Sequence, residues 1–328
     1  MNTSTKSEVK RLGEYAHFAI NKHLKKTLKW ESQVKQDKDP EALHQMRVGM
    51  RRLRTAVSRF DGVIQLPKSA SDRNIGKVSR NLGSLRDIDV LKETLEQKYV
   101  PSLPSEEQKY LQLALEVLKK QRKKAVVEVQ QTLKGKRYKS LVKSMKKWLE
   151  KPEYYPLAYL TLENVLPDLL LPEVSIFMLH PGWLVATQRE ADRIVVPTGW
   201  DKNQIEASLA SQGKIMHDLR KQAKRLRYQM ELFTDRYRES YQEHISEVKN
   251  IQEVLGSIQD SMVLETWLLD IFNSTLREKI PTASQLFIDN RFQLWEQWQS
   301  IQVKYLTPEI RYRFHLTILN PETSQISV

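Results

Sequence analysis

One helical motif occurs twice in this chain, with the two copies 173 residues apart. The first copy begins at His44 and reads HQMRVGMRRLR, and the second begins at His217 and reads HDLRKQAKRLR. A second shared string follows each copy, LGSLRD ending at Asp87 and LGSIQD ending at Asp260, and both aspartates lie 43 residues after the histidine. Two matched strings at one common offset indicate a tandem duplication, so the fold must use one helical unit twice.

Each copy carries an apolar stripe with helical spacing. Its members recur at steps of three and four residues, and the steps are the same in both copies: Leu43, Met46, Met50, Leu53, Val57 and Phe60, then Met216, Leu219, Ala223, Leu226, Met230 and Phe233. This period places the stripe on one face of an α-helix. Each motif is therefore predicted to be a helix packed against other helices.

A row of basic side chains runs beside each stripe. The two rows are His44, Arg47, Arg51 and Arg54, and His217, Arg220, Lys224 and Arg227. At about 100° per residue, each row covers about 80° of the helix surface. Like charges at these spacings repel by about 0.2–0.5 kcal/mol per pair, and nothing within the row offsets this repulsion. A solvated face or ion pairs with neighbouring helices would explain one such row, but the shared register of both copies favours an anionic partner.

Charge is distributed unevenly along the chain. The net charge is +13, and residues 1–164 hold 35 Lys and Arg against 19 Asp and Glu, which leaves the remainder slightly acidic. This distribution predicts a polyanionic partner that is bound mainly by the first repeat. The chain has no cysteine, which excludes disulfides, thiolate nucleophiles and cysteine-based zinc sites and suits a cytosolic protein.

The composition favours long helices. Gly and Pro number only 10 and 13, and helices are predicted over about 6–36, 40–60, 69–99, 105–133, 137–150, 204–237, 240–276 and 283–306. Residues 151–200 are rich in Pro and aromatic residues and are expected to form helical pieces with turns, and 311–319 fits either helix or strand. No signal peptide is visible over residues 1–8, and the most apolar stretch, 165–185, is too interrupted to span a membrane. The predicted fold is all-α, with a first repeat over 1–160 and a second over 161–328.

The shared LGSxxD-type strings suggest structural roles. Glycine inside a helix costs about 1 kcal/mol relative to alanine, so Gly83 and Gly256 are predicted to mark a close approach of helices. Asp87 and Asp260 are predicted to hold motif arginines in place. Asp89 is also assigned a structural role, because the second copy has Met262 at that position and so does not repeat an acidic pair.

With these paired motifs, the chain resembles the CHAD family, the conserved histidine α-helical domain. Its first copy is similar to the family's N-terminal repeat, and its second copy, with KRLRY and ELF, is similar to the C-terminal repeat. The resemblance covers most of the chain. It implies two four-helix bundles related by a pseudo-twofold axis, with the motif helices lining a basic central groove. It also implies a non-catalytic module that binds inorganic polyphosphate, found beside triphosphate tunnel enzymes and in polyphosphate granules, and hence a cytoplasmic or granule-associated protein.

The resemblance also assigns the binding residues. Carried over position by position, they are His44, Arg47, Arg51, Arg52, Arg54, His217, Arg220, Lys224, Arg225 and Arg227. Four basic residues outside the motif helices extend the predicted surface: Lys22, Lys77, Arg80 and Lys123. No catalytic residue, metal or cofactor is expected.

Basic rows suit this ligand because polyphosphate offers charge without bases. Arginine forks phosphate oxygens with two N–H groups, and lysine acts as a point charge. His44 and His217 would donate hydrogen bonds to phosphate, which predicts tighter binding below about pH 6.5. Interhelical packing is the alternative for both histidines.

Two other function classes stay open. A histidine on a helical bundle with cations nearby fits a phosphotransfer protein, and the same charges fit nonspecific nucleic-acid binding. Against the latter, the basic rows lack interleaved aromatic residues on which bases would stack. Hydrolysis is disfavoured, because the chain has no HExxH motif, phosphate-binding glycine loop or GxSxG elbow.

Overall fold

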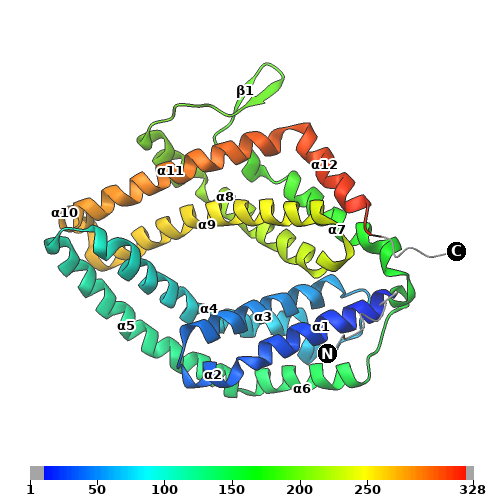
Figure 1. The fold of residues 1–328 in the computed structure, drawn as a ribbon. Coiled ribbons are helices and arrows are strands. Elements are labelled where there is room, and N and C mark those ends of the chain that lie inside the picture. The colour runs from blue at the N-terminus through cyan, green and yellow to red at the C-terminus, as the bar shows by residue number, and fades with distance from the viewer. Residues whose placement is uncertain (1–10, 323–328) are drawn as a thin grey trace, which may run out of the picture. The chain divides into compact units, whose positions relative to one another are not determined.

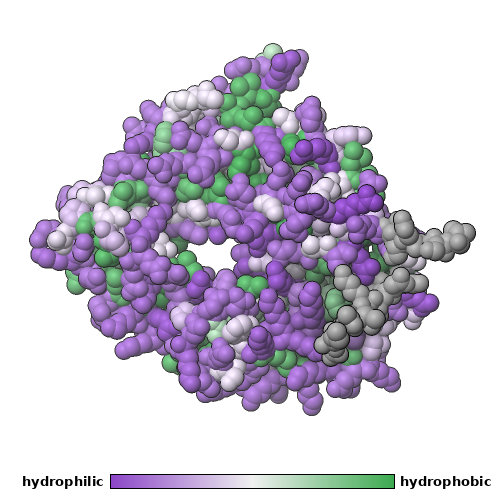
Figure 2. Space-filling model, viewed as in Figure 1, coloured by the Kyte–Doolittle hydropathy of each residue, from purple (hydrophilic) through white to green (hydrophobic). Residues whose placement is uncertain are grey.

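The computed structural model describes residues 11–322, apart from the side chain of Ser274, and this part of the chain is almost entirely helical (Figure 1). The one sheet within these residues is the short antiparallel hairpin of β1 (Gln188–Glu190) and β2 (Arg193–Val195). The predicted all-α fold is confirmed. Over the face shown in Figure 2 the surface is mostly hydrophilic, with scattered apolar side chains.

The described chain divides into two compact units. Unit 1 holds residues 11–97 and 115–166, and unit 2 holds 98–114 and 167–322. The second unit begins at residue 167 along the chain and also includes the segment 98–114. No helix in the described residues has the length and apolarity that crossing a membrane requires.

Unit 1 is a bundle built around the first motif helix, α3. Its helices are α1 (Leu12–Lys29), α2 (Glu31–Gln36), α3 (Pro40–Arg59), α4 (Asp72–Thr94), most of α5 (Ser105–Lys134) and α6 (Lys136–Glu150). α3 packs against both α1 and α4. The predicted apolar stripe of α3 is buried throughout, from Leu43 to Phe60. As predicted, α3 begins at Asp39 and Pro40, where the Asp39 carboxylate accepts a hydrogen bond from the Glu41 backbone N–H.

The first helix differs from its prediction. The single helix expected over 6–36 is divided at Trp30 into α1 and α2, and its first residues, 6–10, lie outside the described part of the chain. The Thr27 hydroxyl donates to the carbonyl of His23, a back-bond that bends helices, and Thr27 packs against Gly49 of α3. The predicted helix over 69–99 is also interrupted, by a 3₁₀ turn at Lys68–Ala70 and a π turn at Leu95–Tyr99.

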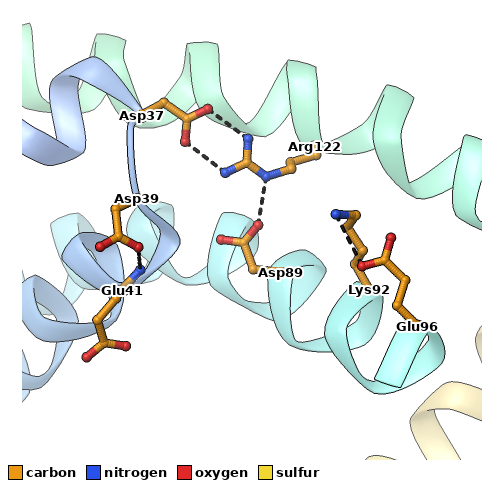
Figure 3. Close-up of polar contacts among 7 residues, drawn as sticks. All are labelled: Asp37, Asp39, Glu41, Asp89, Lys92, Glu96 and Arg122. Carbon is orange, nitrogen blue, oxygen red and sulfur yellow. Dashed lines mark hydrogen bonds and ion pairs between the residues drawn. The ribbon is translucent and has the colours of Figure 1, made fainter. Parts of the chain in front are cut away.

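An arginine of α5 ties together three segments of unit 1 (Figure 3). The two terminal nitrogens of Arg122 donate to Asp37 at 2.7 and 2.8 Å, and its Nε donates to Asp89 at 2.8 Å. Asp37 ends α2 in the left-handed conformation, with φ 48°, shortly before α3 begins. The link therefore fixes the start of the motif helix and confirms the structural role predicted for Asp89.

Unit 2 is built around the second motif helix, α8. Its helices are α7 (Leu162–Met178, which begins in unit 1), α8 (Lys202–Leu232), α9 (Glu239–Phe272), α10 (Leu276–Lys279), α11 (Pro281–Leu306) and α12 (Pro308–Leu319). α9 packs against both α8 and α11. The segment 151–200 contains α7 and two 3₁₀ turns, as expected, together with the unpredicted hairpin. The tail, for which helix and strand were both open, forms α12.

A buried arginine joins three helices of unit 2. Arg291 of α11 donates to both carboxylate oxygens of Glu206 on α8, at 2.7 and 2.6 Å, and lies 2.8 Å from Glu265 on α9. Its side chain is only 1% exposed. Burial alone would lower the pKa of Arg291, and its pairing with the two glutamates raises that pKa above the usual value.

Candidate anion-binding site

Four guanidinium groups line one pocket of unit 1, between α3 and α4. The pocket has a volume of about 310 Å³ and is lined by Arg47, Arg51, Arg54, Gly76, Ser79, Arg80, Gly83 and Asp87. We call it the arginine pocket. Three of its arginines belong to the predicted basic row of α3, and the fourth, Arg80, lies on α4 as one of the predicted residues outside the motif. Four guanidinium groups with one carboxylate make this pocket a candidate site for an anion.

Two glycines of α4 make room for two of these arginines. A Cβ atom added to Gly83 would lie 2.7 Å from Nη1 of Arg47, and one added to Gly76 would lie 3.1 Å from Cζ of Arg54. Both glycines and both arginines are spaced by seven residues, so the two pairs stack along neighbouring helices. The sequence predicted that Gly83 allows two helices to approach. The structure corrects the reason, because the group that lies against Gly83 is an arginine side chain.

Carboxylates on α4 hold the same two arginines. Arg54 donates to Asp72 through Nε at 2.7 Å and Nη2 at 3.0 Å, and the hydrogen bonds to Asp72 raise the pKa of Arg54. Arg47 lies 3.8 Å from Asp87, which confirms the predicted partner. Asp87 is 78% exposed, so this pair orients Arg47 more than it stabilises the fold. Sequence reasoning missed Asp72, whose only signal was an acidic residue at the start of α4.

The placement of Arg47 against Gly83 and Asp87 recurs in unit 2. Arg220 lies 3.4 Å from Asp260, and a Cβ atom on Gly256 would lie 3.1 Å from Nε of Arg220. These are the positions of Arg47, Asp87 and Gly83 shifted by the repeat, so the predicted role of Asp260 is also confirmed. The geometry shows that the two copies kept one way of placing an arginine on a neighbouring helix.

The placement of Arg54 against Gly76 does not recur in unit 2. Lys249 occupies the position that Gly76 has in the first copy. Arg227 is only 12% exposed, lies 3.6 Å from Glu231 and stacks over the Tyr228 ring at 4.7 Å. Its guanidinium is therefore turned toward its own helix and is poorly placed to meet an anion.

Arg52 and Arg225, the first arginine of the RLR string in each motif, also interact within the protein. Arg225 donates to the buried carboxylate of Glu173 on α7 at 2.7 Å. Arg52 does not line the arginine pocket and instead lies near His23 of α1, where burial, Arg52 and two lysines lower the pKa of His23 to about 4. Sequence reasoning placed Arg52 and Arg225 with the binding residues; neither lines the arginine pocket, and Arg225 is paired with Glu173.

The two motif histidines are partly buried beside cations. Burial lowers the pKa of His44, and Arg86 lowers it further. Burial also lowers the pKa of His217, with contributions from Lys221 and Arg220. Both imidazoles are therefore neutral at pH 7. His44 is not among the residues that line the arginine pocket.

The remaining predicted cations are dispersed. Lys22 is exposed on α1, with Nζ 5.7 Å from the Phe18 ring, and Lys123 is exposed on α5. Lys77 on α4 and Lys224 on α8 are partly buried. None of these four lines the arginine pocket. Within the described residues, no group of three or more His, Asp or Glu side chains is arranged to hold a metal ion.

Comparisons with known proteins agree with this architecture. The family model of the CHAD domain matches residues 18–269. The crystal structure of the CHAD domain from the plant Ricinus communis is similar, with 24% identity, coverage of 95% of this chain and 93% of that chain, and a TM-score of 0.58. PptA from Streptomyces chartreusis is similar at 13% identity, over 87% of this chain and 99% of that chain, with a TM-score of 0.50. At these identities the two structures show a shared fold. No curated protein matches the chain.

Proposed function

The chain belongs to the CHAD domain family, and on that premise we propose that it binds inorganic polyphosphate without catalysing a reaction on it. The observation that carries the proposal is the arginine pocket, where Arg47, Arg51, Arg54 and Arg80 line one hollow of unit 1. The ligand pool that fits this role is cytoplasmic polyphosphate, free or in granules, and a triphosphate tunnel enzyme is a suitable partner.

The pocket suits a chain of phosphates for two reasons. Guanidinium groups donate two N–H bonds to phosphate oxygens, and polyphosphate presents such oxygens at every unit without any base to be read. Arg54 and Arg47 are already held by Asp72 and Asp87. Less side-chain freedom is therefore lost when the anion binds, which favours affinity.

Unit 1 is expected to contribute more of the binding than unit 2. In the second motif helix, Arg225 and Arg227 are engaged with Glu173 and Glu231. Arg220 and Lys224 are the members of the row that correspond to Arg47 and Arg51. The excess of basic residues in the first half of the sequence supports the same order.

Calorimetric titration of the full chain with long-chain polyphosphate, in parallel with orthophosphate, tests the proposal. We expect tight binding of polyphosphate that weakens steeply between low and high salt, because most of the affinity comes from released counterions. Orthophosphate should bind weakly, since it meets only one or two guanidiniums. Absence of heat with polyphosphate would contradict the proposal and favour the phosphotransfer alternative, whose signature is acid-labile phosphate on His44 or His217.

Binding is expected to strengthen as the pH falls. His44 is neutral in the free protein at pH 7 because burial and Arg86 lower its pKa. A bound phosphate favours the charged imidazole and raises that pKa, so the complex takes up a proton and affinity rises until the free protein is protonated too. The measurement is the affinity at about pH 8 and about pH 5.5, on either side of the ordinary histidine pKa.

His44→Gln is the control for this pH dependence. The titration of polyphosphate itself is the same for both proteins, so the difference between them isolates the histidine. We expect the increase in affinity at low pH to shrink in the variant. An identical pH profile for the two proteins would show that His44 packs in the bundle without meeting the ligand.

Gly83→Ala is expected to weaken polyphosphate binding by about threefold or more without loss of stability, because one charge-assisted contact is impaired. The new methyl group would displace the guanidinium of Arg47, which is the flexible end of a side chain. Alanine also favours a helix interior over glycine by about 1 kcal/mol, which offsets the cost of this shift. Gly213→Ala is the matched control, because its Cβ atom would meet only Met262. Equal affinity in both variants would contradict the role given to Gly83.

A further inference from the structure

Helix α6 of unit 1 carries an unusual excess of positive charge. Seven basic residues lie exposed between residues 136 and 151, and Glu150 is the only acidic residue among them: Lys136, Arg137, Lys139, Lys143, Lys146, Lys147 and Lys151. The first turn of α6 contains no acidic residue, although the helix dipole disfavours cations there. Neighbouring lysines at three and four residues also repel one another. Both effects disfavour the basic face of α6, whose opposite face is apolar and buried.

Four of these lysines line one pocket. The lysine pocket, of about 520 Å³, is lined by Lys139, Lys143, Lys146 and Lys147 together with Glu31, Tyr138, Val142 and Glu150. Within the described residues none of the four lysines forms an ion pair. Glu31 is already occupied, because it accepts a hydrogen bond from Tyr138 at 2.8 Å and pairs with Lys35. On α5, by contrast, Lys119 is paired with Glu116.

A second pocket adjoins the first and has a different character. It measures about 530 Å³ and is lined by Gln65, Leu66, Pro67, Ser144, Lys147, Trp148, Lys151, Glu153 and Tyr155. Lys147 lines both pockets, so both hollows border this side chain of α6. Tyr155 is 44% exposed, whereas Trp148 is nearly buried and its indole N–H donates to the Glu153 carbonyl at 3.4 Å. Tyr155 is therefore the aromatic ring that a ligand in this aromatic pocket would meet.

We propose that the two pockets together bind a short segment of single-stranded nucleic acid. Its phosphates would lie along the lysines of α6, and one base would stack on Tyr155. Lys139 and Lys147 are eight residues apart, about 12 Å along the helix, which is the reach of a few nucleotides. A cationic track beside an aromatic platform is the arrangement that single strands use.

The aromatic pocket favours single-stranded nucleic acid over polyanions that have no bases. Polyphosphate would use the lysine pocket but has no flat group to place against Tyr155, Leu66 and Pro67. The absence of aromatic residues from the basic rows argues against base stacking on α3 and α8, but α6 differs in this respect. No residue that lines the arginine pocket lines either hollow on α6, so variants can separate the two sites.

Fluorescence anisotropy with a labelled single-stranded oligonucleotide of about 10 nucleotides, a length within the range that such sites cover, tests the proposal on the full chain. Tyr155→Ala should lower oligonucleotide affinity by about fivefold or more, because one base loses its stacking partner. The combined variant Lys143→Gln and Lys146→Gln should lower it further and reduce its salt dependence. Lys119→Gln with Lys120→Gln removes the same charge elsewhere and should have little effect. Circular dichroism checks that every variant is folded.

Competition with tripolyphosphate identifies the ligand class. In Tyr155→Ala the affinity for tripolyphosphate should equal that of the unaltered chain, because this anion has no base. Equal loss for both ligands, no loss for the oligonucleotide, or equal losses in the α6 variant and the α5 control would each overturn the proposal. Binding of anionic vesicles in preference to the oligonucleotide would also overturn it.

Discussion

Arg51→Ala is expected to weaken polyphosphate binding by about tenfold or more, since a lost hydrogen bond to a charged group costs about 1.5–3 kcal/mol. Arg51 lies on α3 between Arg47 and Arg54, and all three line the same pocket with Arg80. Arg51 is the central cation of this row, so its removal takes away the contact that an anion lying between Arg47 and Arg54 would make. The salt dependence should fall as well, because one fewer counterion is released.

Arg52→Ala is the matched control, because it removes the same side chain from the next position of the same helix. Arg52 lies near His23 of α1 and outside the arginine pocket, so its loss should change affinity only slightly. Lys224→Ala, the counterpart of Arg51 in the second repeat, should cause an intermediate loss, because lysine offers a point charge without a fork. Calorimetric titration of the three variants provides the comparison. Equal losses in Arg51→Ala and Arg52→Ala would show that net charge, and not the pocket, determines binding.

The sequence predicts most of the fold because helical periodicity is a local property. The apolar stripe and the Asp39-Pro40 start locate α3 to within a residue, and the repeat then predicts α8 by analogy. The break at Trp30 was missed by helical periodicity; shortly before it, Thr27 donates to the His23 carbonyl and lies against Gly49 of another helix, and periodicity does not predict such contacts. The hairpin between α7 and α8 was missed because each of its two strands is only three residues long, too short for an alternating pattern to be recognised.

The site was predicted less completely than the fold. Helical spacing correctly groups Arg47, Arg51 and Arg54, because one face of one helix is defined by its own sequence. The same reasoning cannot tell which cations meet carboxylates on other helices. Arg225 binds Glu173, which is 52 residues away in sequence, and Asp72 holds Arg54 from the start of α4. Only the three-dimensional arrangement assigns these arginines to structure or to a ligand.

Arg291→Met is expected to lower the free energy of unfolding by about 3–5 kcal/mol, the usual cost of removing one partner from a buried ion pair. The Arg291 side chain is 1% exposed, and its charge is shared between Glu206 and Glu265, which are 32% and 17% exposed. Without the guanidinium, the two carboxylates face each other across the junction of α8, α9 and α11. The measurement is chemical denaturation followed by tryptophan fluorescence, to which the buried Trp183, Trp295 and Trp298 of unit 2 contribute.

Two further variants separate this ion cluster from a general effect of removing charge. Lys202→Met breaks an exposed pair with Asp289, 46% and 39% exposed, and should cost less than about 1 kcal/mol. Adding Glu206→Gln and Glu265→Gln to Arg291→Met removes the unpaired charges and should recover much of the lost stability, because the penalty arises from carboxylates left without a cation. If the triple variant is no more stable than Arg291→Met, the loss must come from packing of the arginine stem. A small effect of Arg291→Met would instead mean that water enters this junction and solvates the glutamates.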